Sequence, residues 1–174
     1  MEARVHEDNN FGTVYGGLLR AALGYQLTDR ITVWQGYGFD PTVQTNYGLS
    51  YVAQQESFQA FRYVLPLNNL MNVTFRTMIE ESFLPSNGNQ IRYRPRQMVR
   101  YVKSFEFEPR LSFIFWDEVF VTINTTPAGG KAGFNQNRGF IGAGWVLNEF
   151  VRFEGGYMNQ YLESTQKLRS QEFK

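Results

Sequence analysis

The feature that most constrains this chain is an alternation of apolar and polar side chains with a period of two residues. Between residues 106 and 124, Arg110 and Glu118 share one parity, whereas Phe113 and Phe115 share the other. A β-strand places such residues on opposite faces, whereas a helix would mix them. The same separation recurs over residues 72–83, 90–102 and 150–161. The pattern therefore predicts an all-β fold with no helix.

Turn-forming residues divide this pattern into hairpins. Short connections, such as the one at residues 66–69, alternate with longer ones rich in Gly, Asn, Pro and Thr, such as residues 125–133. This alternation predicts an antiparallel up-and-down sheet. The predicted strands cover residues 1–8, 14–28, 30–40, 48–64, 69–84, 89–103, 106–124, 134–147 and 149–162.

A closed transmembrane barrel of this type has an even number of strands. We therefore expect an antiparallel up-and-down transmembrane β-barrel of about 10 strands, or about 12 if the chain is truncated. The tail at residues 166–174 is the candidate for a short tenth strand. Residues 1–174 then form one barrel domain, whose strand-forming region covers about residues 1–162.

Composition excludes several classes of protein. The 17 basic and 16 acidic side chains nearly cancel, so no long-range attraction to nucleic acid is expected. The absence of cysteine excludes a disulfide scaffold and a thiolate metal site. No apolar stretch is long enough for a transmembrane helix. We expect no cofactor and no bound metal, and the sequence leaves protein partners and oligomeric state open.

Alternation alone fits both a soluble barrel with an apolar core and a membrane barrel with an apolar exterior. The choice of basic residue favours the second, because 13 of the 17 are Arg and the 4 Lys fall in predicted turns, loops or the tail. Arg suits crowded sites where its guanidinium pairs with carboxylates. Aromatic residues, 17% of the chain, recur near predicted strand ends, as in the girdles of membrane barrels. A soluble lipocalin-like barrel that binds lipid is the alternative.

Several short motifs carry a family resemblance over about residues 14–162. The chain resembles the uncharacterised outer-membrane β-barrel family catalogued as domain of unknown function 2490, although Thr74 stands where the family motif has Arg. The resemblance implies the outer membrane of a Gram-negative bacterium and supplies no established activity. The matching segments are residues 19–25, 31–37, 75–80, 91–94, 117–120, 135–138 with Gly142, and 154–160.

The inward face of such a barrel would carry a network of charged and polar side chains. Buried charges must pair, hydrate or bind anions. One reading is an Arg–Glu ladder that braces the wall, and the other is a narrow passage or site for small anions. The predicted lumen residues are Arg20, Glu56, Arg76, Glu80, Arg92, Arg94, Arg96, Arg100, Glu108, Arg110, Glu118, Gln136, Arg138, Arg152 and Glu154.

The sequence offers no clear catalytic centre. The single histidine, His6, has no nucleophile motif near it, so a hydrolase would need a serine from across the barrel. We therefore predict a protein that is not an enzyme, either structural or a narrow, charge-lined, porin-like pore, in contact with outer-membrane lipid. An outer-membrane hydrolase acting on lipid or envelope material is the alternative from another functional class.

Overall fold

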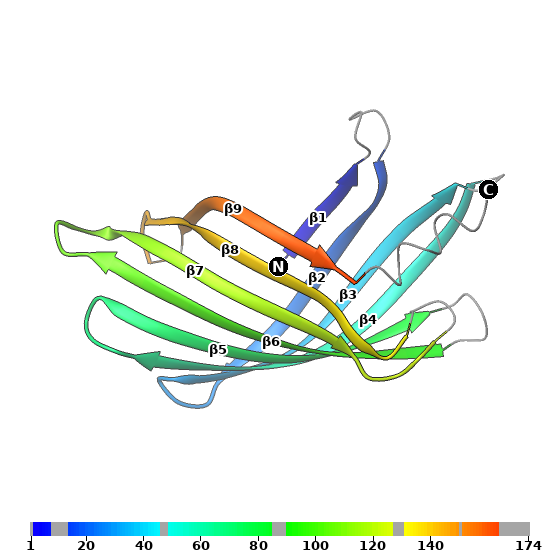
Figure 1. The fold of residues 1–174 in the computed structure, drawn as a ribbon, viewed down its shortest axis with the longest axis horizontal. Coiled ribbons are helices and arrows are strands. Elements are labelled where there is room, and N and C mark those ends of the chain that lie inside the picture. The colour runs from blue at the N-terminus through cyan, green and yellow to red at the C-terminus, as the bar shows by residue number, and fades with distance from the viewer. Residues whose placement is uncertain are drawn as a thin grey trace.

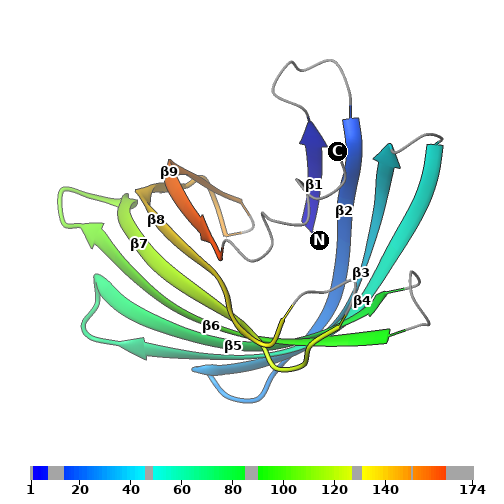
Figure 2. The same cartoon turned by 45° about the vertical axis from the view of Figure 1, so that its right-hand side comes forward.

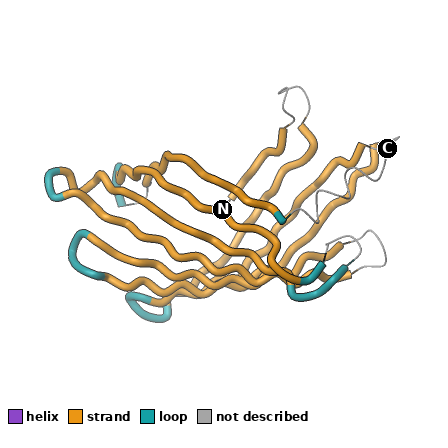
Figure 3. Tube along the Cα trace, viewed as in Figure 1, coloured by secondary structure: helices purple, strands orange, loops and turns teal. Residues whose placement is uncertain are grey.

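The chain forms one sheet of nine antiparallel strands that pair in chain order (Figure 1). The computed structural model describes residues 2–7, 14–45, 49–84, 90–126, 131–149 and 151–163, and no helix occurs in these ranges (Figure 3). Accordingly, no helix there is long and apolar enough to cross a membrane. The strands are β1 (Glu2–Glu7), β2 (Val14–Gln26), β3 (Ile31–Thr45), β4 (Leu49–Pro66), β5 (Met71–Leu84), β6 (Gln90–Phe105), β7 (Glu108–Thr122), β8 (Gly133–Val146) and β9 (Arg152–Leu162).

The predicted all-β, up-and-down topology is confirmed, and each predicted strand has a counterpart. The expected count of about ten is wrong for the described residues, which hold nine strands. The tail proposed as a tenth strand lies outside those residues. Most strand ends differ from the prediction by one or two residues. The larger differences are that β3 continues to Thr45 and that β9 begins at Arg152, and β6 continues to Phe105, which moves the expected turn to residues 106–107.

Three of the tight connections at one end of the sheet are closed by side chains. In the β2–β3 turn, Thr28 Oγ1 accepts from the backbone N–H of Ile31 at 3.1 Å. In the β4–β5 turn, Asn68 Oδ1 accepts from the N–H of Leu70 at 2.9 Å. Asn148 does the same for Val151 before β9, also at 2.9 Å. Asn and Thr at these positions supply the acceptor that lets a short turn close, so this end of the sheet is compact.

The sheet curls strongly, so that one face becomes concave (Figures 1 and 2). Strands β1 and β9 are its two edges, and no described residue of one pairs with the other. The fold is therefore barrel-like in topology and curvature, but the described strands do not form a closed barrel.

Burial on the two faces is the reverse of a soluble sheet. On β5, Glu80 and Ser82 face inward and are fully buried, whereas Phe75 and Ile79 face outward with 37% and 45% of their surface exposed. Phe153 on β9 is 61% exposed. On β4 to β7, charged side chains of the inner face are buried or half-buried and several aromatic side chains of the outer face are exposed, whereas on β9 both faces are exposed. A smaller apolar group also lies inside and includes Ile114 and Phe120, which are almost fully buried.

Candidate functional site: a charged interior

The charged side chains of the concave face converge on Glu80 of β5. Arg20 Nη2 donates to Glu80 Oε1 at 2.8 Å, and Arg94 Nε donates to Oε2 at 2.7 Å. Arg96 Nη1 also donates to Glu80 Oε1. Three guanidinium groups from β2 and β6 thus share one fully buried carboxylate. This arrangement satisfies both carboxylate oxygens with charge-assisted hydrogen bonds.

Arg96 extends these contacts into a continuous network. Its Nη2 lies 2.8 Å from Glu118 Oε1 on β7, and the same oxygen accepts from Arg76 Nη2 at 2.8 Å. At the other end, Arg20 also forms an ion pair with Glu56 of β4. We call this group the central network; it consists of Arg20, Glu56, Arg76, Glu80, Arg94, Arg96 and Glu118.

Glycines on β3 leave space for a side chain of β2 to reach β5 across the two strands between them. Gly38 lies in register between Arg20 and Glu56. A Cβ at Gly38 would lie 2.9 Å from Glu56 Cγ and 3.1 Å from Arg20 Cγ, closer than side chains normally pack. Gly36, one inward position away, similarly leaves room for the Phe58 ring. The absence of side chains at these glycines of β3 therefore leaves the space through which Arg20 reaches Glu80.

The Phe120 ring forms an aromatic platform under the arginines. The guanidinium carbon of Arg96 lies 4.3 Å from the ring centroid, and those of Arg138 and Arg94 lie 5.0 and 5.4 Å from it. Cation–π contacts of this kind are strengthened when the groups are desolvated. Gln136 is buried nearby, and its amide oxygen, when turned toward Arg138, accepts from Nη2 at 3.0 Å.

A second ion-pair group joins strands farther along the sheet. Arg100 Nη2 of β6 donates to Glu154 Oε1 of β9 at 2.6 Å, and Arg152 Nη1 lies 3.9 Å from the same oxygen. Strands β7 and β8 lie between Arg100 and Glu154 in the sheet. The contact is made across the concave face, which shows how tightly this part of the sheet curls.

Three other predicted lumen residues lie outside both ion-pair groups and away from the Phe120 ring. Arg92 is half-buried and donates to Ser82 Oγ at 3.2 Å, with no ion pair to another described residue. Glu108 and Arg110 lie at the start of β7, where the carboxylate accepts from the Arg110 backbone N–H at 3.2 Å. Arg110 is exposed, so these two residues belong to the turn rather than to the network. The His6 side chain, considered for catalysis, lies outside the described side chains.

The concave face holds a half-open cavity of about 970 Å³, which residues of the central network partly line. Arg62, which the sequence analysis did not select, lies on its wall, donates to Thr32 Oγ1 at 3.1 Å and packs 5.0 Å from the Trp34 ring centroid. The inward positions of β4 are mostly apolar, as at Phe58, so alternation did not assign Arg62 to a charged face. The presence of Arg rather than Lys within a predicted strand was the signal that could have assigned Arg62 to the interior.

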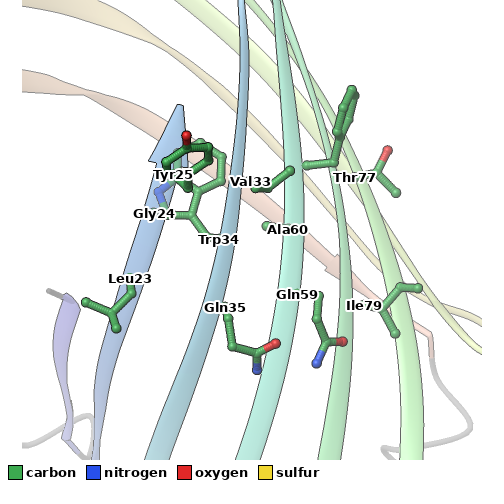
Figure 4. Close-up of a pocket in the computed structure, with 11 residues that line it drawn as sticks. Leu23, Gly24, Tyr25, Val33, Trp34, Gln35, Gln59, Ala60, Thr77 and Ile79 are labelled. Carbon is green, nitrogen blue, oxygen red and sulfur yellow. The ribbon is translucent and has the colours of Figure 1, made fainter. Parts of the chain in front are cut away.

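The outer face carries a shallower groove of about 570 Å³ across β2 to β5 (Figure 4). Its wall is mostly apolar, and Gln35 and Gln59 lie side by side in it. Both amides donate to Ser57 Oγ, at 3.1 and 3.4 Å. On β5, Thr77 Oγ1 donates to Gln97 Oε1 at 2.6 Å. These outward polar side chains therefore hydrogen-bond to one another.

Within the described ranges, no three His, Asp or Glu side chains come together as metal ligands. The carboxylates of the central network instead face guanidinium groups, which supply positive charge where a cation would otherwise lie. The arrangement can brace the sheet or bind anions.

Comparison with known proteins adds a family match. A family model described as "Protein of unknown function (DUF2490)" matches residues 1–171. An uncharacterised protein of Methylorubrum extorquens is 29% identical over 146 residues, which cover 82% of this chain and 62% of the relative. The chain thus spans less than two thirds of that relative's length. No solved structure matches the chain.

Proposed function

The chain belongs to the DUF2490 family of proteins of unknown function, and on that premise we propose that it is a bacterial outer-membrane β-barrel with a structural role. The central network braces its interior and fills much of the space next to the cavity. The short turns face the periplasm and the longer loops face the exterior, as is usual in such barrels. Surrounding lipid is its main partner.

The inverted burial carries this proposal. A soluble protein rarely exposes a large contiguous apolar surface while it buries its charges. Here Glu80 is fully buried, whereas Ile79 and Phe115 on the outer face of interior strands are 45% and 47% exposed. A soluble barrel that stores lipid would have the opposite facing. Lipid hydrocarbon around the outer face would remove these apolar side chains from water.

The network favours bracing over an open pore. Its arginines and glutamates project from β2, β4, β5, β6 and β7 and meet over the concave face. Barrels of this size are only slightly wider than those that side chains fill completely. A narrow anion passage is the second candidate, because arginines such as Arg62 and Arg138 line the neighbouring cavity.

The test combines membrane insertion with conductance. Purified protein refolded into phosphatidylcholine vesicles should resist carbonate extraction and should migrate differently on gels with and without heating. In planar bilayers it should give no ion current above background. Steady anion-selective current would favour the passage over the structural barrel, whereas protein that remains in the aqueous phase without detergent would contradict both.

The proposal assigns the barrel no catalytic step. The sequence has one histidine and no nucleophile motif near it. A strain carrying His6→Ala should therefore keep its envelope lipid composition, measured by mass spectrometry of extracted lipid. A change in that composition, with the barrel still folded, would favour a hydrolase.

A further inference from the structure

The cavity on the concave face changes character along the strands. Arg62 and Arg76 are register partners and line it, and Arg76 is itself part of the central network. Two residues closer to the short turns, their places are taken by Val64 and Thr74. The wall there continues with Val102, Trp116 and Met158, together with Arg100 and Arg152, whose charges lie next to Glu154. Guanidinium groups therefore line both ends of the cavity. At the short-turn end they lie next to Glu154 and among apolar side chains, whereas Arg62 has no carboxylate partner among the described residues.

Arg62 and Arg76 have unused hydrogen-bonding capacity. They lie directly opposite each other on neighbouring strands, where like charges destabilise a sheet. Arg76 pairs with Glu118, whereas Arg62 has no carboxylate partner among the described residues and bonds the Thr32 hydroxyl. The Nε atoms of both are buried and lack any hydrogen-bond partner in that part of the chain. Both side chains line the cavity, so an anion bound against them would offset the repulsion between the two like charges and accept from their terminal N–H groups.

We propose that this cavity binds a single-chain amphiphile with an anionic head group, a carboxylate or a phosphate. The head lies against Arg62 and Arg76, and the chain extends along Val64, Val102 and Met158 toward the short turns. The volume of about 970 Å³ is at the upper end of the range for small-ligand sites, about 300–1,000 Å³. The proposal rests on the one above insofar as a complete barrel encloses this cavity.

Tryptophan fluorescence offers a direct test. Of the three tryptophans, Trp34 and Trp116 line the cavity, whereas Trp145 lies on the outer face and is 39% exposed. In a Trp34→Phe, Trp145→Phe background, all the signal comes from Trp116 in the cavity, because Trp34 also borders the outer groove. The probe is 11-bromoundecanoate, whose bromine quenches nearby indoles, titrated into protein in nanodiscs. Quenching should saturate, and 11-bromoundecanol, which lacks the charge, should quench weakly and without saturation.

Variants then locate the head group. In the same background, Arg62→Gln should raise the half-quenching concentration about tenfold, because a charge-assisted hydrogen bond is lost. Arg62→Lys keeps the charge and should raise the half-quenching concentration less. Arg110→Gln, at an exposed arginine that does not line the cavity, should leave the half-quenching concentration unchanged. Unequal mobility of heated and unheated samples verifies that each variant is folded.

Three results would overturn the proposal: equal quenching by the alcohol, an unchanged midpoint in Arg62→Gln, or displacement of the probe by inorganic phosphate as readily as by undecyl phosphate. The last would indicate a site for free anions instead of amphiphiles. The membrane assignment fails separately, since saturable quenching by a protein that does not insert into vesicles would retain the site and reject the outer-membrane barrel.

Discussion

At Glu80, three guanidinium groups depend on one carboxylate. Removing one partner of a buried ion pair typically costs about 3–5 kcal/mol, because the remaining charges stay buried without compensation. We therefore expect Glu80→Gln to lower the free energy of unfolding by roughly that amount. Urea titration of the protein in lipid vesicles, followed by tryptophan fluorescence, measures this change.

The neighbouring residue provides the matched control. Glu81 points to the opposite face, is half-buried and has no ion pair with another described residue. Glu81 lies three residues from the loop end of β5, beyond the roughly 9–11 residues that a tilted strand needs to cross the hydrocarbon, so Glu81→Gln should change the unfolding free energy by no more than about 0.5 kcal/mol. Comparable losses in the two variants would mean that the central network does not stabilise the sheet.

At the level of single residues, sequence reasoning could predict facing but not pairing. The preference for Arg over Lys correctly indicated enclosed positions such as Arg94 and Arg96. It could not predict that Arg20 would reach Glu80, 60 residues away, because that contact depends on the curl of the sheet and on Gly38. Arg62 was missed because its apolar neighbours obscured the alternation.

Strand β3 depends on small residues, as β8 does at Gly142. A Cβ at Gly36 would run into the buried Phe58 ring, which packs beside Arg20. Gly36→Ala should therefore cost about 1–3 kcal/mol through overpacking. Gly155→Ala on β9, where nothing lies within 4 Å of the added carbon, should be nearly neutral. The same urea titration compares the two variants, and equal stabilities would show that an added methyl group at Gly36 is accommodated without overpacking.

Strand β7 tests what surrounds the outer face. Phe115 is 47% exposed in the middle of its apolar side. If Phe115 faces water, Phe115→Arg should leave the folding free energy nearly unchanged. If it faces hydrocarbon, the substitution should destabilise the fold by about 2–4 kcal/mol. Phe107→Arg, in the β6–β7 turn, should cost only about 0–1 kcal/mol near the membrane surface. Folding free energies in vesicles measure both, and a neutral Phe115→Arg would contradict a lipid-facing position.

Strand boundaries were predictable where a strand separates its residues cleanly, as the prediction of 69–84 for β5 illustrates. The end of β3 was not predictable, because the Pro, Thr, Asn and Gly residues between positions 40 and 48 are typical of a loop. Beyond Phe39, β3 pairs only with β4, so Pro41 lies in an edge segment, where a residue without an N–H is tolerated. That relationship between three strands is not visible in the local sequence.

For the whole molecule, alternation predicted the order of strands but could not predict closure. Whether two edge strands pair is not encoded in the periodicity of either one. The described sheet accordingly has two free edges, at β1 and β9, rather than the closed ring of about ten strands that we expected. In water an open edge is tolerated, but in hydrocarbon each unpaired backbone group costs several kcal/mol.

This difference gives a test of the complete molecule. In β9, alternate amides bond to β8, and the rest point away from it. If the protein is embedded in lipid, those outward amides must also find a partner. Hydrogen exchange in nanodiscs should therefore protect both sets of amides in Arg152–Leu162 to a similar degree, with the turn at residues 106–107 as a fast-exchanging reference. Rapid exchange of every second β9 amide would reveal an edge open to water and would contradict a lipid-embedded barrel.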